Sequence, residues 1–520
     1  MKRKLLFSGI LMAGMAGSVF AQEAPDAAAV QKIRDEGLNH SKVMETAFYL
    51  TDVSGPRLAN SPGLKRAQDW AVNQLKSWGL ENAKREPWGK FGKGWEVQKN
   101  YAAITVPYYH AIIAIPKAWT SGTNGPIKGD VVVVKADTVT DLDQYKGKLA
   151  GKIVIFDTKN KLAGSTKADL TRYTDEELDK MANATSQPAA QRRAPDRASP
   201  QMTAFQRARA LRTAISNFLQ QENVGLILSM ARGTDGTVFT TNGASYTDTA
   251  KTAAPELETS GEDYLRILRL VKGGQKVEME ADIKTQFFTD DLQGYDVVAE
   301  IPGTDKKLKD QIVMVGGHLD SWHAATGATD NAAGSAVMME AVRILKAIGF
   351  KPKRTIRIAL WSSEEQGLFG SRYYVLNHFG DPKTMQLKPE QAKVSAYYNL
   401  DNGTGKIRGI YLQGDSLAGA VFKPWFEPFK DLGASTITVG NTGGTDHLSF
   451  AAVGIPGFQF IQDSMDYGTR THHSNQDTYD RLSEDDLKQA ATIIASFVYN
   501  TAQRAEMIPR AEPPKAQSTN

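Results

Sequence analysis

Short apolar runs alternate with amphipathic helical patterns in the second half of the chain, from about residue 293 onward. The apolar runs predict buried strands at Ile312–Val315, Thr355–Trp361, Ala396–Leu400, Gly409–Leu412 and Pro456–Ile461. Helical spacing of apolar residues is found at Ala333, Val337, Ala341 and Leu345, and again after Ser483 at Leu487, Ala491, Ile494 and Val498. This alternation predicts an α/β fold with a mixed, largely parallel sheet between helices.

The first half of the chain carries a different pattern. Leu64, Ala67, Ala71 and Leu75 mark an amphipathic helix that ends at Gly79. From about residue 116, short β-type runs lie between glycines and charged residues, with a helical pattern at Phe205–Leu219 and an alternating, edge-like strand at Val277–Ile283. We therefore predict a β-rich module at 116–285, inserted into an α/β domain made of 22–115 and 286–506.

Both ends of the chain indicate segments outside these domains. Lys2, Arg3 and Lys4 precede a mostly apolar stretch, Leu5–Val19, that is too short to span a bilayer comfortably. We expect a signal peptide at 1–21 and a secreted or periplasmic protein, and no other apolar run is long enough for a membrane span. The composition of the tail, 507–520, and of the Pro-, Ala- and Arg-rich stretch Ser186–Pro200 predicts disorder or mobility.

Composition narrows the possible chemistry. The 520-residue chain has a formal net charge of +4, and removal of the three basic residues of the leader leaves +1, so no nucleic-acid partner is expected. The chain has no cysteine, so a metal site must use His, Asp and Glu. Six of its 8 histidines are His318, His323, His378, His447, His472 and His473.

Candidate ligands follow the predicted strands. His318 ends the first strand, the pair Glu364-Glu365 follows the second, and Asp401 follows the third, while Asp330 opens the next helical pattern. Sites in open α/β sheets form at this carboxyl edge. Taken singly, each has a plainer interpretation: a satisfied histidine, a helix-capping aspartate, or a solvated loop. His472-His473 alone would equally fit an exposed pair.

Together these residues match the needs of two divalent cations that activate one water molecule. Such a pair requires a bridging carboxylate, an imidazole and a carboxylate for each metal, and a further carboxylate that accepts a proton. The chain supplies these as His318, Asp330, Asp401, His473 and the pair Glu364-Glu365. Adjacent glutamates point in different directions, so one can bind metal while the other faces the substrate.

The stretches HLDS…ATDNAAG, ALWSSEEQGLFGSRYY, NLDNGTG, GGTDHLSFAAVGIPG and HHSNQDT resemble the co-catalytic zinc exopeptidases of metallopeptidase family twenty-eight. KPKRTIRIALWSSEEQG and the double histidine before Ser474 look closest to its carboxypeptidase Q branch. The module at 116–285 is similar to a protease-associated domain through KGKLAGKIVIF and PELETSGEDYLRIL, although Ser186–Pro200 departs from it. The resemblance implies a phosphorylase/hydrolase-like three-layer fold and two zinc ions.

The resemblance also implies a role for individual residues. His318 and Asp401 would hold one zinc, Glu365 and His473 the other, Asp330 would bridge them, and Glu364 would be the general base. Asp320 would orient His318, and His472 would steady the oxyanion of the transition state. His447 would lie near the substrate. Asn331 stands where the branch often has a second acid, which leaves the ligands intact but alters the charge around them.

The resulting hypothesis is an exported di-zinc exopeptidase that acts on peptides or dipeptides as an aminopeptidase or dipeptidase. Carboxypeptidase action on longer chains would need a cation for the terminal carboxylate. Arg470 is the nearest candidate, although a surface arginine is the preferred interpretation. A one-zinc, glutaminyl-cyclase-like acyltransferase and a metal-free binding protein remain as alternatives. The oligomeric state stays open, with a homodimer among the options.

Overall fold

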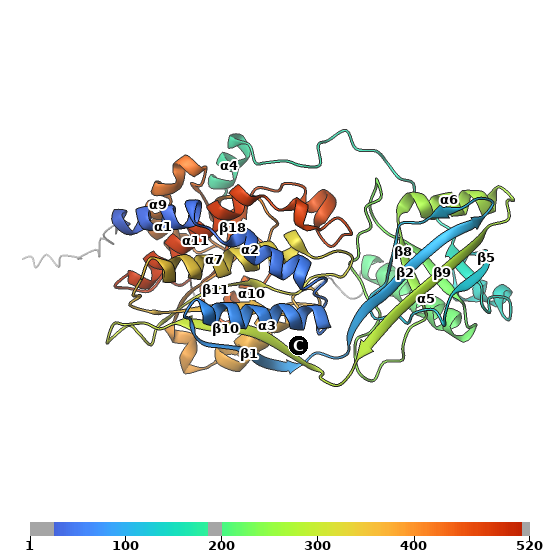
Figure 1. The fold of residues 1–520 in the computed structure, drawn as a ribbon, viewed down its shortest axis with the longest axis horizontal. Helices are drawn as coiled ribbons and strands as arrows, with labels where there is room; N and C mark the ends of the chain where they lie inside the picture. Colours follow the sequence, from blue (N-terminus) through green and yellow to red (C-terminus); the bar gives the residue numbers. More distant parts are fainter. Residues whose placement is uncertain (1–24, 186–199, 512–520) are drawn as a thin grey trace, which may run out of the picture.

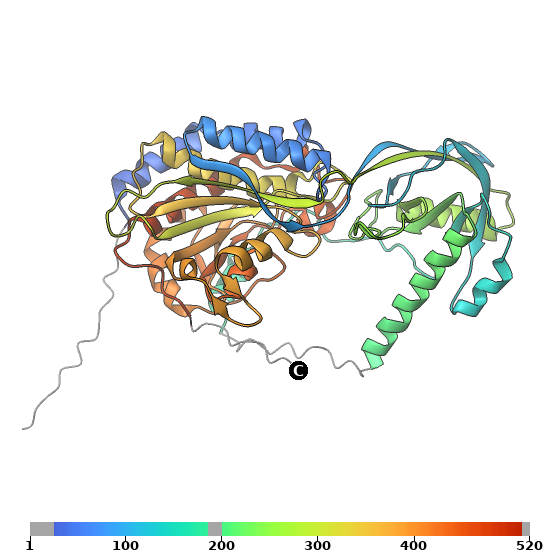
Figure 2. The same ribbon diagram turned by 90° about the horizontal axis from the view of Figure 1, so that it is seen from below.

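The computed structural model describes residues 25–185 and 200–511, which form two lobes with one eight-stranded β-sheet each (Figure 1). The expected signal peptide and the stretch from Ser186 to Ser199 lie outside the described residues. Figure 2 shows the two lobes side by side, with a pair of long strands passing between them. The larger lobe contains the candidate ligands.

The sheet of the larger lobe has eight strands in the order β1-β10-β12-β11-β15-β18-β16-β17. The four central strands, β12, β11, β15 and β18, are mutually parallel. The outer pairs β1·β10, β10·β12 and β16·β18 are antiparallel. The strands are β1 (Glu81–Lys90), β10 (Gln293–Ile301), β11 (Ile312–His318), β12 (Thr355–Trp361), β15 (Val394–Asn399), β16 (Ile407–Tyr411), β17 (Thr436–Thr438) and β18 (Gly457–Gln462). The predicted mixed, largely parallel sheet is confirmed.

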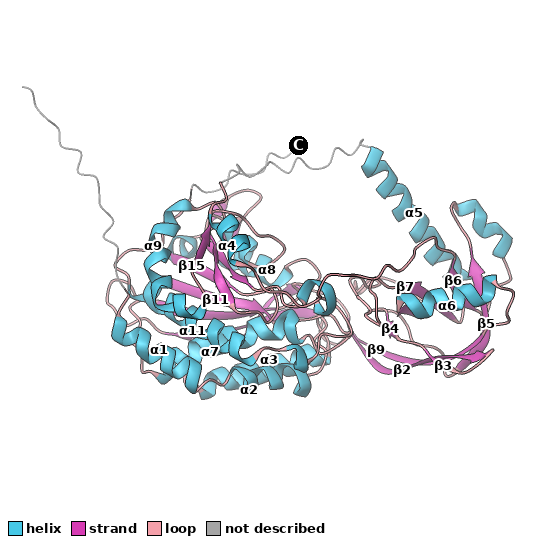
Figure 3. Cartoon of the chain, turned by 90° about the horizontal axis from the view of Figure 1, so that it is seen from above, coloured by secondary structure: helices cyan, strands magenta, loops and turns pink. Residues whose placement is uncertain are grey.

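Helices cover both faces of this sheet (Figure 3). One face packs against α1 (Ala27–Asn39), α3 (Pro62–Ser77), α7 (Ala333–Ala347) and α11 (Glu484–Gln503), whose apolar sides share the main core with Val313 and Val315. The other face packs against α8 (Phe369–His378) and α10 (His447–Ala451) in a smaller core around Trp361. Side chains along β11 point alternately to the two faces of the sheet and so belong to both cores. The strand is therefore buried on both sides.

The second sheet has the order β3-β2-β9-β5-β6-β7-β8-β4 and carries α5 (Pro200–Gln221) and α6 (Gly261–Lys272). It begins earlier than residue 116, because β2 (Gly94–Val106) pairs along its length with β9 (Glu278–Phe288). The prediction of an edge strand at Val277–Ile283 was wrong, since β9 lies between β2 and β5. The other strands are β3 (His110–Ala111), β4 (Ala114–Pro116), β5 (Ile127–Val134), β6 (Ile153–Phe156), β7 (Leu226–Met230) and β8 (Glu256–Thr259).

One segment of the insertion returns to the larger lobe. Thr171 and Met465 exchange backbone hydrogen bonds, Arg172 forms ion pairs with Asp463 and Asp486, and α4 (Asp175–Ala182) lies against β17. The insertion is therefore held at a point far from its own sheet.

The described part of the C-terminal tail is also packed against the larger lobe. Ile508 is buried, and Arg510 donates to the carbonyls of Gln391 and Val394. These contacts contradict disorder for residues 507–511, whereas the rest of the tail lies outside the described residues. Within the described residues, no helix combines the length and the apolar character that crossing a bilayer requires.

Candidate metal centre

The candidate ligands meet at the carboxyl edge of the parallel strands. His318 is the last residue of β11 and pairs with Trp361, the last residue of β12. Glu364 and Glu365 follow Trp361 by three and four positions, and Asp401 comes two positions after the end of β15. Neighbouring parallel strands end side by side, so these side chains gather at one place.

Asp330 reaches the same place from the turn before α7. Its backbone is not helical (φ −128°, ψ 87°), and α7 begins three residues later, at Ala333, where the predicted apolar face also begins. Asn331 donates from its side-chain amide to the carbonyl of Leu400 and accepts from Gly334 N–H. A Cβ on Gly334 would lie 2.2 Å from the Leu400 carbonyl oxygen, so only glycine permits this approach of α7 to β15.

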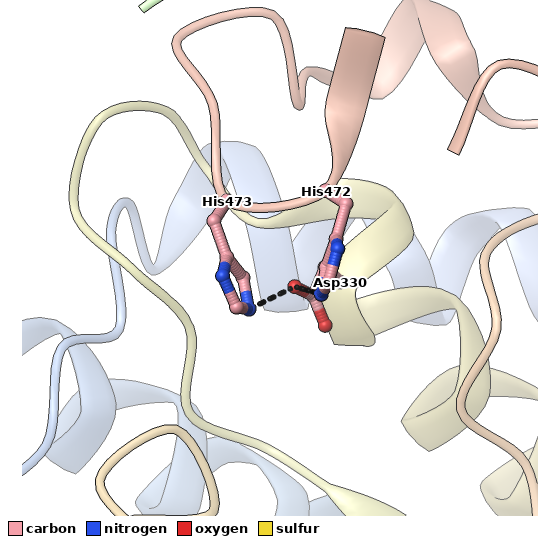
Figure 4. Close-up of side chains that lie close together, drawn as sticks. All are labelled: Asp330, His472 and His473. Carbon is pink, nitrogen blue, oxygen red and sulfur yellow. Dashed lines mark ion pairs between the residues drawn. The ribbon is translucent and has the colours of Figure 1, made fainter. Parts of the chain in front are cut away.

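Asp330 lies against His472 and His473 (Figure 4), and its two carboxylate oxygens face two different ligand candidates, His318 and His473. Oδ1 lies 3.3 Å from His318 Nε2, and Oδ2 lies 3.1 Å from His473 Nε2. His318 Nε2 is also 3.2 Å from Asp401 Oδ1, and His473 Nε2 is 2.8 Å from Glu365 Oε2. The five side chains thus form two imidazole–carboxylate groups that share one aspartate.

The donor set fits metal cations. Glu365 Oε1 is buried without a hydrogen-bond partner, and buried Asp330 Oδ2 has only its ion-pair contacts with the two adjacent histidines. Asp330, His318 and Glu365 each offer a ligand atom within 4.8 Å of the others, as do Asp330, His472 and His473. Imidazole nitrogens and carboxylate oxygens are suitable zinc ligands. Buried acceptors without donors are costly, and a cation removes that cost.

The buried carboxylates of the cluster also require a compensating positive charge. Burial raises the pKa of Glu365 to about 7, against the effect of His473. Burial alone would lower the pKa of His473, but Glu365 and Asp330 raise it to about 11. In return, His473 and His318 hold the pKa of Asp330 well below its usual range despite its burial. Protons on the two histidines balance the carboxylates here, and metal binding would displace them.

Asp320 fixes the two adjacent glutamates. Its carboxylate accepts the backbone N–H groups of Glu364 and Glu365, at 3.2 and 3.4 Å. Its backbone carbonyl is 3.0 Å from His318 Nδ1, whereas its carboxylate is 3.7 Å away, so the carbonyl is the nearer partner of the imidazole. The Glu364 carboxyl forms no hydrogen bond or ion pair with a described residue, and burial raises its pKa well above the usual value.

The remaining predicted residues lie at different distances from this cluster. His472 is 40% exposed, stacks on Tyr467, and has its Nε2 3.7 Å from Asp330 Oδ2. His447 is buried, and its Nε2 lies 3.3 Å from the Thr442 carbonyl. Arg470 points to the insertion, where it binds Asp169 and Asp235. His472 therefore forms the open edge of the cluster, and Arg470 is occupied by other partners.

Two residues without a predicted role position the ligands. Asp477 accepts the backbone N–H groups of Thr329 and Asp330, at 2.6 and 3.1 Å. Arg57 is fully buried and donates to the carbonyls of Leu50, Leu319, Thr326 and Gly327. The sequence showed Arg57 only as part of a Gly-Pro-Arg turn, and Asp477 only within HHSNQDT.

The insertion contacts the loop that carries His472 and His473. Thr240 N–H donates to the His473 carbonyl at 2.7 Å, and Phe239 forms an antiparallel bridge with Ser474. Val238 N–H donates to the side chain of Asn475. The second lobe therefore forms one wall of the candidate centre.

Imidazole and carboxylate ligands at this edge of an α/β sheet are typical of metal-dependent hydrolases. Residues 296–498 match the model of Peptidase family M28. Carboxypeptidase Q of Bos taurus is 26% identical over 478 residues, which covers 91% of this chain and 88% of the bovine protein. The match and the relatives confirm the predicted resemblance to this family and the predicted class of enzyme, a metallo-exopeptidase.

Solved structures agree with this assignment. A Peptidase M28 precursor from Shewanella amazonensis SB2B superposes with a TM-score of 0.64 at 26% identity, covering 94% of this chain and 99% of that one. A zinc aminopeptidase from Bacillus subtilis has the same fold, with a TM-score of 0.51 at 19% identity over 90% of this chain and 96% of its own. The likeness covers both lobes.

Proposed function

We propose that this chain is an exported di-zinc exopeptidase that removes residues from the ends of short peptides, acting as an aminopeptidase or dipeptidase. The arrangement of Asp330 carries this proposal, because its two oxygens face His318 and His473 separately. His318 with Asp401 would hold one ion and His473 with Glu365 the other. Zinc is the metal named for the Bacillus subtilis relative, and two ions suit the two groups.

When bound, such a pair activates a water molecule and stabilises the negative charge that develops on the scissile carbonyl. Glu364 would accept the proton of this water on a carboxylate oxygen and deliver it to the leaving amine. Burial raises the pKa of Glu364 well above its usual value, which suits a group that accepts a proton and passes it on. His472, at the open edge, would donate a hydrogen bond from Nε2 to the carbonyl oxygen of the substrate.

We predict that charged groups at the centre determine which end of a peptide is bound. The carboxylates around the centre favour a substrate ammonium, which is why aminopeptidase or dipeptidase action is proposed. Arg470 does not support carboxypeptidase action on long chains, because Asp169 and Asp235 already bind its guanidinium. A basic n-region and an apolar stretch at residues 1–21 support export.

Zinc content of the purified protein tests the proposal, together with hydrolysis of neutral dipeptides. We expect two zinc ions per chain and activity that a chelator removes and zinc restores. One ion per chain would favour the acyltransferase alternative. A protein that binds no metal and cleaves no peptide after zinc addition would instead be a binding protein on this scaffold.

A further inference from the structure

A cavity of about 270 Å³ adjoins the loop that carries Glu364, and none of the candidate metal ligands lines it. Ser362 and Ser363, the two residues before Glu364, form part of its wall, and α3, β1, β10 and the connection from β9 form the rest. Helix α3 lies over β1 and β10 (Figure 1). The volume suits one small molecule, since pockets for drug-sized ligands hold about 300–1,000 Å³.

The wall next to Glu364 offers a hydroxyl group without a partner. Ser363 is buried and lines the cavity, and its hydroxyl forms no hydrogen bond with a described residue. Its backbone is left-handed (φ 57°), a conformation that is unfavourable for residues other than glycine. Buried hydroxyl groups are normally hydrogen-bonded, so this position suits a polar group of a ligand.

The charged groups of the cavity come from different elements. Lys65 and Arg85 belong to α3 and β1, whereas Asp290 and Asp291 belong to the connection between β9 and β10. Arg85 already has a carboxylate partner at 3.1 Å, and Asp291 accepts a tyrosine O–H at 3.0 Å. Lys65 and Asp290 are exposed, and neither forms an ion pair with a described residue. An unpaired cation and an unpaired anion therefore border the same small cavity.

The first turn of α3 indicates where a carboxylate would bind. Pro62 and Leu64 line the cavity together with Lys65, so the amino end of this 16-residue helix borders it. The helix dipole and the lysine both favour an anion at this end. Asp290 favours an ammonium, and Phe288 adds apolar surface to that of Leu64. A carboxylate, an ammonium and an apolar side chain are together the groups of a free apolar amino acid.

We propose that this cavity binds a free α-amino acid with an apolar side chain, whose carboxylate contacts Lys65 and whose ammonium contacts Asp290. Free amino acids are products of the proposed peptidase, so the regulatory meaning of this inference rests on the proposed function. The ligand would also bind the Ser363 hydroxyl, beside the backbone that Asp320 fixes at Glu364. A ligand favours the conformation that it binds, so the amino acid should stabilise this arrangement of the general base and raise kcat.

Calorimetry with L-leucine tests the site on the full zinc-loaded chain. Saturating acetohydroxamate occupies the metal centre and carries neither an ammonium nor a carboxylate, so it leaves the cavity free. Leucine should still bind, and N-acetyl-leucine and leucinamide should bind at least about 10-fold more weakly, because each lacks one of the two charges. Absence of leucine binding, or equal binding of the three compounds, would overturn the inference.

Substitutions locate the bound amino acid. Lys65→Gln and Asp290→Asn should each weaken leucine binding about 10-fold, and Lys65→Arg should keep most of it because the charge remains. Lys76→Gln is the matched control, because Lys76 is an exposed lysine in the last turn of α3 and does not line the cavity. Wild-type affinity in either Lys65→Gln or Asp290→Asn would contradict the assigned contacts and overturn the inference.

Hydrolysis of a dipeptide that contains no leucine measures the effect on the Glu364 loop. Leucine at the metal centre competes with the substrate and raises KM, whereas leucine in the cavity should raise kcat about 5-fold, the lower end of typical couplings between two sites. An unchanged kcat, or a rise that persists in Asp290→Asn, would overturn the regulatory effect. Wild type that binds leucine as expected but cleaves no peptide would reject the proposed function and still support the binding site.

Discussion

At the scale of single residues, Glu364 and Glu365 are neighbours with opposite surroundings. Glu365 contacts His473 at 2.8 Å, whereas the Glu364 carboxyl has no hydrogen-bonded or ion-paired partner among the described residues. Asp320 holds both backbone N–H groups, so neither glutamate can exchange places with the other without breaking these contacts. The contacts favour Glu365 as ligand and Glu364 as base, the order that the family resemblance implies.

Substitution separates the two roles. Glu364→Gln keeps size and hydrogen bonding but cannot accept a proton, so kcat should fall about 10²- to 10⁴-fold with two zinc ions retained. Glu365→Gln should lose zinc from one site and regain activity in excess zinc, because an amide is a weaker ligand than a carboxylate. Zinc titration and steady-state kinetics measure both. Metal loss in the first variant and retention in the second would show that the roles are reversed.

At the scale of elements, Arg57 connects the turn after β11 with the loop before α7. Its four carbonyl partners include Leu319, next to His318, and Gly327, three residues before Asp330. Burial lowers the pKa of Arg57 to about 10, so it remains charged at neutral pH. The guanidinium therefore sets the spacing of two ligands without contacting either.

Arg57→Gln should lower the free energy of unfolding of the metal-free protein by at least about 3 kcal/mol, because buried carbonyls lose their donors at about 1–3 kcal/mol each. Zinc affinity should fall as well, since both ligand-bearing turns lose a support. Urea unfolding with and without zinc measures the two effects. Arg66→Gln is the control: Arg66 is exposed and donates to one carbonyl, so a change as large as that of Arg57→Gln would contradict the argument.

A second prediction for elements concerns α8, where His378 joins β1 to the rest of the lobe. Glu390 and Glu86 raise the pKa of His378 to about 9. A histidine with a raised pKa stabilises the fold fully below its unfolded value of about 6.5, and this contribution disappears as pH rises through 9. The shift corresponds to at most about 3 kcal/mol, reduced by partial exposure of the side chain.

The difference in unfolding free energy between wild type and His378→Gln should therefore be largest at pH 6 and should shrink by pH 10. Urea unfolding of the metal-free proteins across this range gives the difference directly. A difference that stays constant from pH 6 to pH 10 would show that packing, rather than the ion pairs with Glu86 and Glu390, accounts for the effect.

How much of the structure the sequence predicts depends on how far apart in the chain the interacting residues lie. Apolar runs define strands, and parallel strands end at one edge, so the gathering of His318, Asp401 and the glutamates was predictable. The orientation of each Asp330 oxygen was not, because it depends on a non-helical turn. Arg57 escaped notice because arginine is almost never fully buried, and composition gives no sign of such an exception.

At the scale of the whole molecule, the errors come from pairings that are distant in sequence. The alternating pattern of apolar and polar residues in β9 is typical of an edge strand. Its partner β2 lies more than 170 residues earlier, so the sequence around β9 does not indicate this pairing. The return of residues 169–182 to the larger lobe has the same cause. These distant contacts connect the insertion to the metal centre, so its function is visible only in three dimensions.

Arg470 connects the two lobes. Its substitution therefore measures how much the insertion supports the histidine loop of the metal centre. Arg470 is 15% exposed and donates to Asp169, Asp235, Thr237 and the Thr234 carbonyl, all in the insertion. Because it lies two residues before His472, release of the insertion should loosen the histidine loop. Arg470→Gln should weaken zinc binding about 10-fold and expose the 234–240 segment to proteolysis.

Asp235→Asn provides a graded control. Asp235 is 72% exposed, so solvent screens its ion pair with Arg470 and the loss of this pair should change stability little. Asp169, on the other side of the guanidinium, is 41% exposed, and Asp169→Asn should have an intermediate effect. Limited proteolysis and zinc titration measure these effects. The gain in protease sensitivity and the loss of zinc affinity should be larger in Arg470→Gln than in Asp169→Asn or Asp235→Asn. Equal zinc affinity in all three would mean that the insertion docks on the histidine loop without supporting its ligand, and that the backbone contacts of Thr240 and Phe239 suffice.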